Sequence, residues 1–393
     1  MKRVPKPVFF IVALLILAFA FTALFGIAYY NGDNKVTVLK GSGRVLAGKQ
    51  VEVRPLEGET AVYEADHIIL ATGSHPAELP FAPIDGEKIW CYYQALTPEA
   101  LPKSLAVIGS GAIGTEFAFF YRSLGVEVTV IEFMERVLPI EDDDTCAQVS
   151  RSLRKAGIKV MVSSSVKSVD TTGELCKLTV ETKKGMETVE AEKVLSAVGV
   201  RPNTEGLGLE ALGIELMRGK VPVDKFYKTP VEGVYAIGDI IATPALAHVA
   251  SAEAICCVEA IAGLNPEPVN YDNIPGCTYI TPEVASVGMT ERKAKDMGID
   301  YKVGKFPFTA SGKATAAGAR DGFVKLIVDA ATDKVLGAHL VGDNVSEMIG
   351  GIVAARNLGV TAKQLAGSMF PHPTMSEALM EAAAAVHGEA IHI

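Results

Sequence analysis

The first residues whose types and spacing could do chemistry are glycines. Gly109, Gly111 and Gly114 form a G-x-G-x-x-G pattern directly after an apolar run that predicts a strand. Such glycines allow a tight turn and let a pyrophosphate approach the positive N-terminal end of the next helix. Glu132 ends the following expected strand, where a carboxylate accepts hydrogen bonds from a ribose diol. This order predicts a dinucleotide site, and Phe133, in the place of a phosphate-binding arginine, favours NAD over NADP.

A second group lies near the C-terminus, in the segment HPTMSE at 372–377. A carboxylate bonded to one ring nitrogen of a histidine fixes the tautomer and raises the basicity of the other nitrogen. His372 and Glu377 therefore predict a base suited to proton exchange with a thiol near neutral pH.

The cysteines have no spacing that suggests a metal site, so none is predicted. They lie at 91, 146, 176, 256, 257 and 277. Cys256 and Cys257 are adjacent in an alanine-rich stretch, and two small helix residues are favoured there over a vicinal redox pair because such a disulfide departs from relaxed geometry. Scattered, unpaired cysteines fit a reducing compartment and hence a cytoplasmic location for the bulk of the chain.

Length and charge narrow the possible classes. A chain of 393 residues can form two or three domains, each with its own core. The net charge of −9 argues against a nucleic-acid partner, which requires a basic face.

Residues 8–30 form an uncharged apolar run. As a helix this run is roughly 34 Å long, enough to cross a bilayer, so a transmembrane anchor is the first interpretation. A signal peptide and a misjoined gene start are the alternatives. The flanking lysines and arginines do not decide an orientation in the membrane.

The rest of the chain predicts an α/β fold. Valine-rich alternation from residue 35 indicates a small antiparallel ribbon, and HIILAT at 67–72 is typical of a buried parallel strand. Strands and helices alternate over 101–200. A strand at 233–240 precedes a helix over 247–262, and residues 271–393 mix strands and helices in an α+β layer.

Several ordered motifs resemble the pyridine nucleotide–disulfide oxidoreductases, from about residue 35 to the C-terminus. They are ILATG (69–73), GSGAIG with Glu132, SAVGVRPN (196–203), YAIGD (235–239), ALAH (245–248), YITPEVASVGMTE (279–291) and HPTMSE (372–377). The resemblance implies a flavoprotein that oxidises dihydrolipoyl groups with FAD and NAD. The histidine base of this family acts on the partner subunit's disulfide, so the resemblance also implies a homodimer. It implies in addition a lipoyl-bearing protein as a partner.

The resemblance implies an arrangement of domains as well. A Rossmann-like NAD domain is inserted in a partial FAD-binding domain, and an α+β dimerisation domain follows. The expected parts are an apolar anchor (1–34), a remnant of the FAD domain with the ribbon (35–100), the NAD domain (101–203), the second FAD part (204–270) and the dimerisation domain (271–393).

Cofactor-binding roles also follow from the resemblance. Asp239 is expected to contact the ribityl chain of the flavin, with a helix cap as the structural alternative. The segment ALAH is expected near the flavin ring. The further cofactor-binding residues that we expect are Thr72, Gly73, Glu116, Gly199, Ala247 and His248.

The chain departs from the family at its start. The family begins with a further G-x-G-x-x-G for FAD and a C-x-x-x-x-C redox pair, and this sequence contains neither. We therefore expect weak or lost FAD binding, impaired activity, and strands at HIILAT and VYAIGD that lack neighbours. The alternative functions are a non-catalytic, membrane-tethered, NAD-binding dimeric remnant and a truncated gene product.

Overall fold

The computed structural model describes residues 10–12 and 36–392. The chain forms two compact units, each built from two separate stretches of sequence. Unit 1 comprises Met1–His75 and Val200–Tyr271, and unit 2 comprises Pro76–Gly199 and Asp272–Ile393. The predicted α/β class is confirmed, and the predicted NAD-binding segment interrupts the chain of unit 1.

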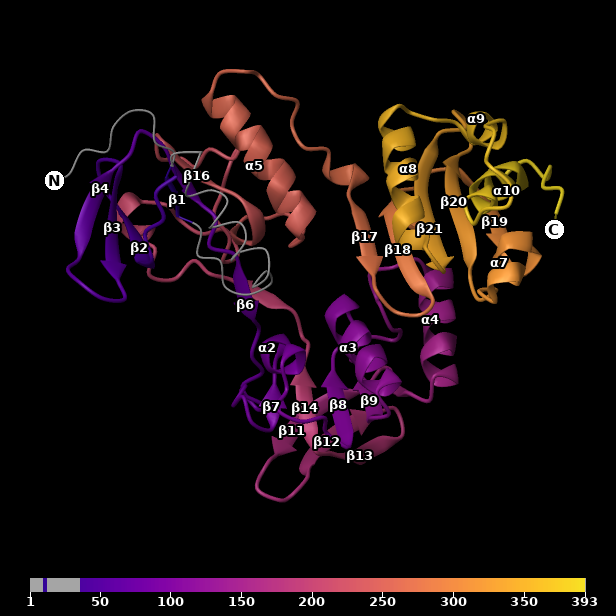
Figure 1. The fold of residues 1–393 in the computed structure, drawn as a ribbon, viewed down its shortest axis with the longest axis horizontal. Coiled ribbons are helices and arrows are strands. Elements are labelled where there is room, and N and C mark those ends of the chain that lie inside the picture. The colour runs from indigo at the N-terminus through magenta and orange to yellow at the C-terminus, as the bar shows by residue number, and fades with distance from the viewer. Residues whose placement is uncertain (1–9, 13–35, 393) are drawn as a thin grey trace. The chain divides into compact units, whose positions relative to one another are not determined.

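Unit 1 is centred on a three-stranded parallel sheet in the order β1-β5-β16. Figure 1 labels its two outer strands, β1 and β16. Its strands are β1 (Phe10–Val12), β5 (Ile68–Leu70) and β16 (Val234–Ala236). All three residues of β5 are buried, and they pack with Cys257 of helix α5 (Ala247–Ile261). A separate antiparallel sheet of β2 (Gly41–Leu46), β3 (Gln50–Pro55) and β4 (Ala61–Glu64) is the ribbon that the valine alternation predicts. Two short 3-10 helices are η1 (Glu210–Leu212) and η2 (Gly238–Ile240).

The transmembrane helix predicted within residues 8–30 is wrong. Residues 10–12 form β1, which runs parallel to β5 with Phe10 opposite Ile68. Over 10–12 and 36–392, no helix combines the length and the apolar character needed to cross a membrane. The rest of the apolar run lies outside the described residues. Periodicity cannot distinguish a continuous apolar run in a buried strand from one in a helix, and this ambiguity misled the prediction.

The expectation of strands without neighbours is also wrong. β5 pairs with β16 on one side and with β1 on the other, both in parallel. An unpaired edge exposes a row of N–H and C=O groups, and β1 satisfies that edge of β5. The apolar run that suggested a membrane anchor thus supplies a strand of this sheet.

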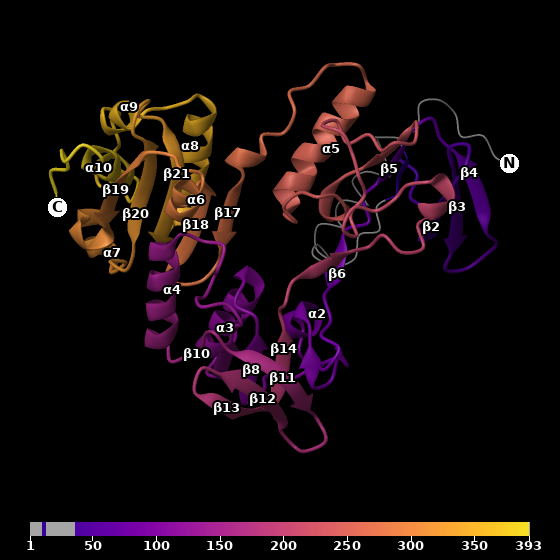
Figure 2. The ribbon, with the colours of Figure 1, turned by 180° about the vertical axis from the view of Figure 1, so that it is seen from behind.

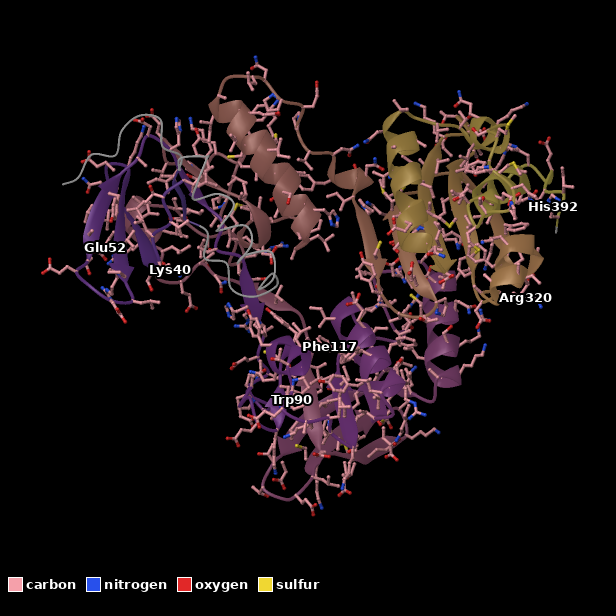
Figure 3. All side chains as sticks on the ribbon, in the orientation of Figure 1. Lys40, Glu52, Trp90, Phe117, Arg320 and His392 are labelled. Carbon is pink, nitrogen blue, oxygen red and sulfur yellow. The ribbon has the colours of Figure 1, made fainter. Side chains whose placement is uncertain are left out.

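The part of unit 2 that is predicted to bind a dinucleotide contains a five-stranded parallel sheet in the order β10-β9-β8-β14-β7. Trp90 and Phe117, both labelled in Figure 3, belong to the core on its α3 side. The strands are β7 (Ile89–Trp90), β8 (Ser104–Ile108), β9 (Glu127–Ile131), β10 (Lys159–Met161) and β14 (Lys193–Ser196). The helices are α2 (Tyr92–Leu96), α3 (Ala112–Ser123) and α4 (Asp143–Lys155). An antiparallel meander adds β11 (Ser165–Asp170), β12 (Cys176–Thr182) and β13 (Gly185–Ala191).

The C-terminal part of unit 2 is a five-stranded antiparallel sheet in the order β17-β18-β21-β20-β19. Helix α8 packs on β18 and β21, and α10 packs on β19 and β20 (Figure 2). The strands are β17 (Pro275–Thr278), β18 (Glu283–Gly288), β19 (Tyr301–Pro307), β20 (Phe323–Asp329) and β21 (Val335–Gly342). The helices are α6 (Glu291–Asp296), α7 (Gly312–Ala317), α8 (Val345–Asn357), α9 (Ala362–Ala366) and α10 (Glu377–Ala385), with η3 (Tyr271–Asn273) and η4 (Phe308–Ala310). The remaining strands, β6 (Ser74–Pro76) and β15 (Val200–Pro202), form a two-stranded sheet.

A buried charge cluster joins the two parts of unit 2. Lys325 of β20, whose side chain is 1% exposed, donates to Asp142 Oδ1 at 2.6 Å and to Asp144 Oδ2 at 3.0 Å. Its third partner is the carboxylate of Glu291, the first residue of α6. Three carboxylates this close could hold a metal ion, but here the ammonium group of Lys325 binds all of them. The cluster therefore ties the start of α4 to the C-terminal sheet.

Candidate functional site

The glycine loop after β8 is closely packed against its own backbone. Gly109 has a φ of +97°, and a Cβ there would lie 2.5 Å from the carbonyl oxygen of Ala197. A Cβ on Gly114 would lie 2.1 Å from the carbonyl oxygen of Gly109. Any larger residue would force the backbone apart at either position, so these two glycines are required by the loop itself.

Gly111 differs from its two neighbours in the pattern. It is the N-cap of α3, and no atom lies within 4 Å of the position of its Cβ. The packing of the chain therefore does not demand glycine here. The space lies beside the first N–H groups of a helix, which is where a phosphate group binds.

Glu132 is 6% exposed and accepts three hydrogen bonds from the protein. Its Oε2 accepts the N–H and the hydroxyl of Ser110, each at 2.7 Å, and its Oε1 accepts the N–H of Met134 at 2.7 Å. An ionised carboxylate offers about four acceptor positions, so one position on Oε1 remains for a ribose hydroxyl. Glu132 thus also holds the glycine loop in place. Sequence reasoning missed Ser110, although it stands between the first two glycines.

A hollow of about 270 Å³ lies next to Glu132. Phe133, which is 73% exposed, contributes an aromatic ring. The other lining residues are Ser163, Ser165, Glu181, Thr182 and Lys183. An exposed ring beside hydroxyl and charged groups can stack on a planar base and hydrogen-bond with its edge.

Glu116 lies in the second turn of α3. Its Oε1 accepts the N–H of Tyr279 at 2.8 Å, which links α3 to the segment after β17. Burial raises the pKa of Glu116, and the Tyr279 N–H opposes that shift. Gly199 has a φ of +102°, and no atom lies within 4 Å of its Cβ position. Both residues lie in unit 2 with the glycine loop.

Unit 1 contains the other predicted cofactor residues. Thr72 Oγ1 donates to the carbonyl of Asn203 at 2.6 Å, and Asn203 Nδ2 donates back to the carbonyl of Thr72 at 2.8 Å. The N–H of Asn203 also donates to Gly73 at 2.9 Å. The predicted Asp239 accepts a hydrogen bond from Ser74 Oγ on its Oδ2 at 2.5 Å. The motifs ILATG and SAVGVRPN are therefore hydrogen-bonded to each other, although they lie far apart in the sequence. Sequence reasoning did not single out Asn203 or Ser74 as residues of this site.

The N-terminus of α5 is the third element of this site. Ala247 and His248 are exposed in its first turn, which contains no acidic residue and has no side-chain cap. Unpaired N–H groups at a helix start attract electron-rich oxygens. Close by in the sequence, the buried hydroxyl of Thr243 has no hydrogen-bond partner in the described part of the chain. These features fit a polar ligand with carbonyl oxygens, such as a flavin ring.

His372 and Glu377 form the predicted dyad. His372 Nδ1 lies 2.8 Å from Glu377 Oε1, and Glu377 Oε2 accepts the N–H of Thr374 at 2.7 Å. Burial alone would raise the pKa of Glu377, but the bonds from Thr374 and His372 outweigh it and hold the pKa below its ordinary value. The His372 side chain is 79% exposed. The dyad therefore presents Nε2 outward while Nδ1 is fixed.

A second pair of this kind lies one turn along α10. His392 Nδ1 is 2.7 Å from Oε1 of Glu381, whose side chain is 5% exposed. The N–H of Ile391 donates to Glu381 Oε2 at 3.0 Å. Sequence reasoning missed this pair, although the spacing of Glu377 and Glu381 places both carboxylates on the same face of a helix.

The six cysteines are free thiols. Five are buried, and only Cys277 is partly exposed. Burial raises the pKa of Cys146 and of Cys257 to about 12, which keeps both protonated at neutral pH. Cys256 and Cys257 are ordinary helix residues, as predicted.

The fold and site define an α/β dinucleotide-binding oxidoreductase with a separate C-terminal α+β layer. Comparison with known families makes this specific. The family model described as pyridine nucleotide-disulphide oxidoreductase matches residues 20–254, and the model of its dimerisation domain matches residues 274–383. The chain belongs to the pyridine nucleotide-disulphide oxidoreductases.

Curated relatives are nearly half identical to this chain over the aligned residues. Dihydrolipoyl dehydrogenase of Rhizobium etli is 46% identical over 93% of this chain and 80% of its own. Dihydrolipoyl dehydrogenase of Zymomonas mobilis is 45% identical over 91% of this chain and 78% of its own. Among solved structures, LpdA of Mycobacterium tuberculosis is similar with a TM-score of 0.82 at 32% identity, over 88% of this chain and 77% of its own.

Proposed function

We propose that this chain is a dihydrolipoyl dehydrogenase-type enzyme. In the net reaction, a dihydrolipoyl dithiol and NAD⁺ give the cyclic disulfide, NADH and one proton. The observation that carries the proposal is the dyad of His372 and Glu377, in which a fixed imidazole is exposed to an incoming thiol. Relatives named for this activity support it.

The dyad moves the proton. His372 Nε2 accepts the proton of a substrate thiol, and Glu377 stabilises the imidazolium that forms. The N–H of Thr374 donates to the second oxygen of Glu377, which fixes the orientation of the carboxylate. Because His372 is exposed, it can return the proton to solvent. A homodimer through the dimerisation domain would bring this base to the partner subunit.

FAD, when bound, supplies the two-electron step between the dithiol and NAD. Asp239, Thr72 and the N-terminus of α5 would hold it, since all three offer polar groups within unit 1. For NAD, Gly111 leaves space for the pyrophosphate, and the remaining acceptor position of Glu132 receives a ribose hydroxyl. The hollow beside Phe133 would take the adenine ring.

We further propose that the chain by itself turns over slowly and retains FAD weakly. The sequence contains no C-x-x-x-x-C pair, and its free cysteines are mostly buried. An absorbance spectrum of the purified chain and NADH oxidation with lipoamide test this. Stoichiometric bound flavin together with fast turnover would contradict it.

A second candidate function is a dimeric NAD-binding protein without catalysis. The lack of the cysteine pair favours it. Lipoamide-dependent NADH oxidation distinguishes the two functions, because only the enzyme couples the cofactor to a dithiol. Measurable turnover that disappears in His372→Gln would exclude the non-catalytic function.

Gly111→Val tests the nucleotide site that both functions share. The side chain enters space that the chain leaves open, so folding is expected to be unaffected while NADH binding is blocked. Gly350→Val is a matched control in α8, since its Cβ position is equally open. Quenching of NADH fluorescence measures the affinity. Equal affinity in Gly111→Val and Gly350→Val would remove the assigned site.

A further inference from the structure

Glu253 is a carboxylate in the middle of α5 that the proposed chemistry does not use. It is 0% exposed. Within 10–12 and 36–392, no lysine, arginine or histidine forms an ion pair with it. Burying such a group is costly unless hydrogen bonds replace the lost water. Its hydrogen-bond partners therefore indicate what it does.

One partner is the loop that carries Asp239. Glu253 Oε2 accepts the N–H of Gly238 at 2.6 Å. Gly238 has a φ of +71°, and a Cβ there would lie 3.4 Å from Cβ of Ala250 on the same helix. The loop thus lies directly on α5. A charge-assisted hydrogen bond holds the N–H of its left-handed residue, and the carbonyl of that residue accepts the N–H of Ile241 at 3.0 Å.

The other partner lies at the end of unit 1. Tyr271 donates its hydroxyl proton to Glu253 Oε1 at 2.8 Å, and the hydroxyl of Tyr227 lies 3.0 Å from that of Tyr271. Because Tyr271 has one hydroxyl proton, Tyr227 must be the donor to Tyr271. The carbonyl of Tyr227 accepts the N–H of Ala236, at the end of β16. The network therefore connects β16, the Gly238 loop and α5.

The position of Asp239 depends on this network. Among the described residues, Ser74 Oγ is the one hydrogen-bond donor to its side chain, at 2.5 Å, and its carbonyl accepts a bond from Lys220. Since Gly238 immediately precedes it, release of the Gly238 N–H would let the peptide rotate and carry the carboxylate of Asp239 with it.

We propose that Glu253 is a positioning residue for the flavin. It fixes the Gly238 peptide so that Asp239 presents its carboxylate to the hydroxyl-bearing chain of FAD. The inference rests on the proposed use of FAD and adds a residue that does not touch the cofactor.

The test uses the full chain in four forms: the parent, Glu253→Ala, Glu253→Gln and Glu259→Gln. Glu259→Gln is the matched control, because Glu259 is a partly buried glutamate on the same helix. Affinity is measured by titration with FAD and its fluorescence. Hydrogen exchange of the peptide over residues 233–243 is measured without cofactor. Circular dichroism confirms that each variant is folded.

We expect Glu253→Ala to weaken FAD binding by about tenfold or more, because the N–H of Gly238 and the hydroxyl of Tyr271 lose their acceptor. Glu253→Gln is expected to fall between this variant and the parent, since an amide keeps only one acceptor oxygen. In the cofactor-free protein, the Gly238 amide should exchange faster in both Glu253 variants and not in Glu259→Gln.

The outcomes separate the two proposals. Unchanged FAD affinity and unchanged exchange in Glu253→Ala would overturn the positioning role. If the parent binds no FAD at all, the cofactor part of the proposed function fails, and the exchange measurement still decides whether Glu253 fixes the loop. Faster exchange with unchanged affinity would show that the loop is released without consequence for FAD, which also overturns the inference.

Discussion

Two regions of unit 2 combine carboxylates with a basic side chain, and they differ in burial. Lys325 and its three carboxylates are enclosed where α4 and α6 meet the C-terminal sheet, and the side chains of Lys325 and Asp142 are 1% and 0% exposed. The dyad of His372 and Glu377 has its histidine 79% exposed. In the first region the ammonium group is inside the protein and bonded to three carboxylates, whereas in the second a ring nitrogen faces solvent. Burial therefore gives the first arrangement a structural role, and exposure allows the second to exchange protons with solvent.

The largest effect is expected from breaking the buried cluster. Lys325→Met removes the cation that bonds all three carboxylates and leaves the buried Asp142 without an ion-pair partner in the described part of the chain. Removing one partner of a buried ion pair typically costs about 3–5 kcal/mol in the free energy of unfolding. Urea unfolding followed by circular dichroism measures this.

Lys155→Met is the control for that experiment. Lys155 also binds an aspartate, Asp321, at 2.8 Å, but the two side chains are 74% and 56% exposed. An exposed pair contributes about 0–1 kcal/mol. Similar losses in Lys155→Met and Lys325→Met would show that burial is not what distinguishes the cluster.

A substitution in the exposed dyad should lower activity rather than stability. His372→Gln is expected to leave the free energy of unfolding nearly unchanged and to lower lipoamide-dependent turnover by about 10²-fold or more, because general base catalysis is lost. NADH binding should stay the same. His387→Gln is the control, since His387 also bonds a carboxylate, that of Asp333 at 3.1 Å. Equal turnover in the two variants would remove His372 from the reaction.

Acid should lower the free energy of unfolding of the parent more steeply than that of a variant without the lysine. Burial alone would raise the pKa of Asp142 and of Asp144. The bonds from Lys325, together with that from Lys305 to Asp144, outweigh it and hold both below their ordinary value of 3.8. A lowered carboxyl pKa stabilises the fold above the unfolded value, and this stabilisation is lost as the pH falls through the folded pKa. The free energy of unfolding of the parent should therefore drop more steeply below about pH 4 than that of Lys325→Met.

Two neighbouring groups also titrate in this experiment. Burial lowers the pKa of His339, so protonation of that ring destabilises the fold as the pH falls below its ordinary value of 6.5. Burial raises the pKa of Glu141, which acts in the opposite direction. Because both groups are present in both proteins, the difference between the two pH profiles isolates the contribution of Lys325. Parallel profiles would contradict the assignment.

The sequence predicted the parts of the site that are local. Gly109, Gly114 and Glu132 belong to one strand, loop, helix and strand, whose order fixes their neighbours, and the dyad lies within six consecutive residues. The cluster of Lys325 could not be predicted, because its members come from segments at 142–144, 291 and 325 that only the tertiary fold brings together. A single lysine in a predicted strand looks like an ordinary solvent-facing residue, although the first six residues of β20 are all buried.

The N-terminal error has a different cause. An apolar run without charges satisfies both a membrane helix and a buried strand, and only the edge of β5 decides between them. The bonds of Ser110 to Glu132 were likewise invisible, since a serine between two glycines has no pattern that assigns its partner.

The smallest effect is expected at Glu116, which lies between the two extremes of burial. Burial raises the pKa of this carboxyl, which accepts the N–H of Tyr279 at 2.8 Å. Within residues 10–12 and 36–392 no cation is bonded to it in the way that Lys325 is bonded to Asp142. Glu116→Gln keeps the acceptor oxygen and removes the charge, so the free energy of unfolding at pH 7 should change by less than about 1 kcal/mol, toward higher stability. Urea unfolding at pH 7 and pH 5 checks this, and the gain should shrink at pH 5 because the parent carboxyl is then more protonated. A loss of stability comparable to that of Lys325→Met would mean that a cation in the protein compensates the charge of Glu116. Glu116 would then resemble Asp142 and would not be an uncompensated carboxylate.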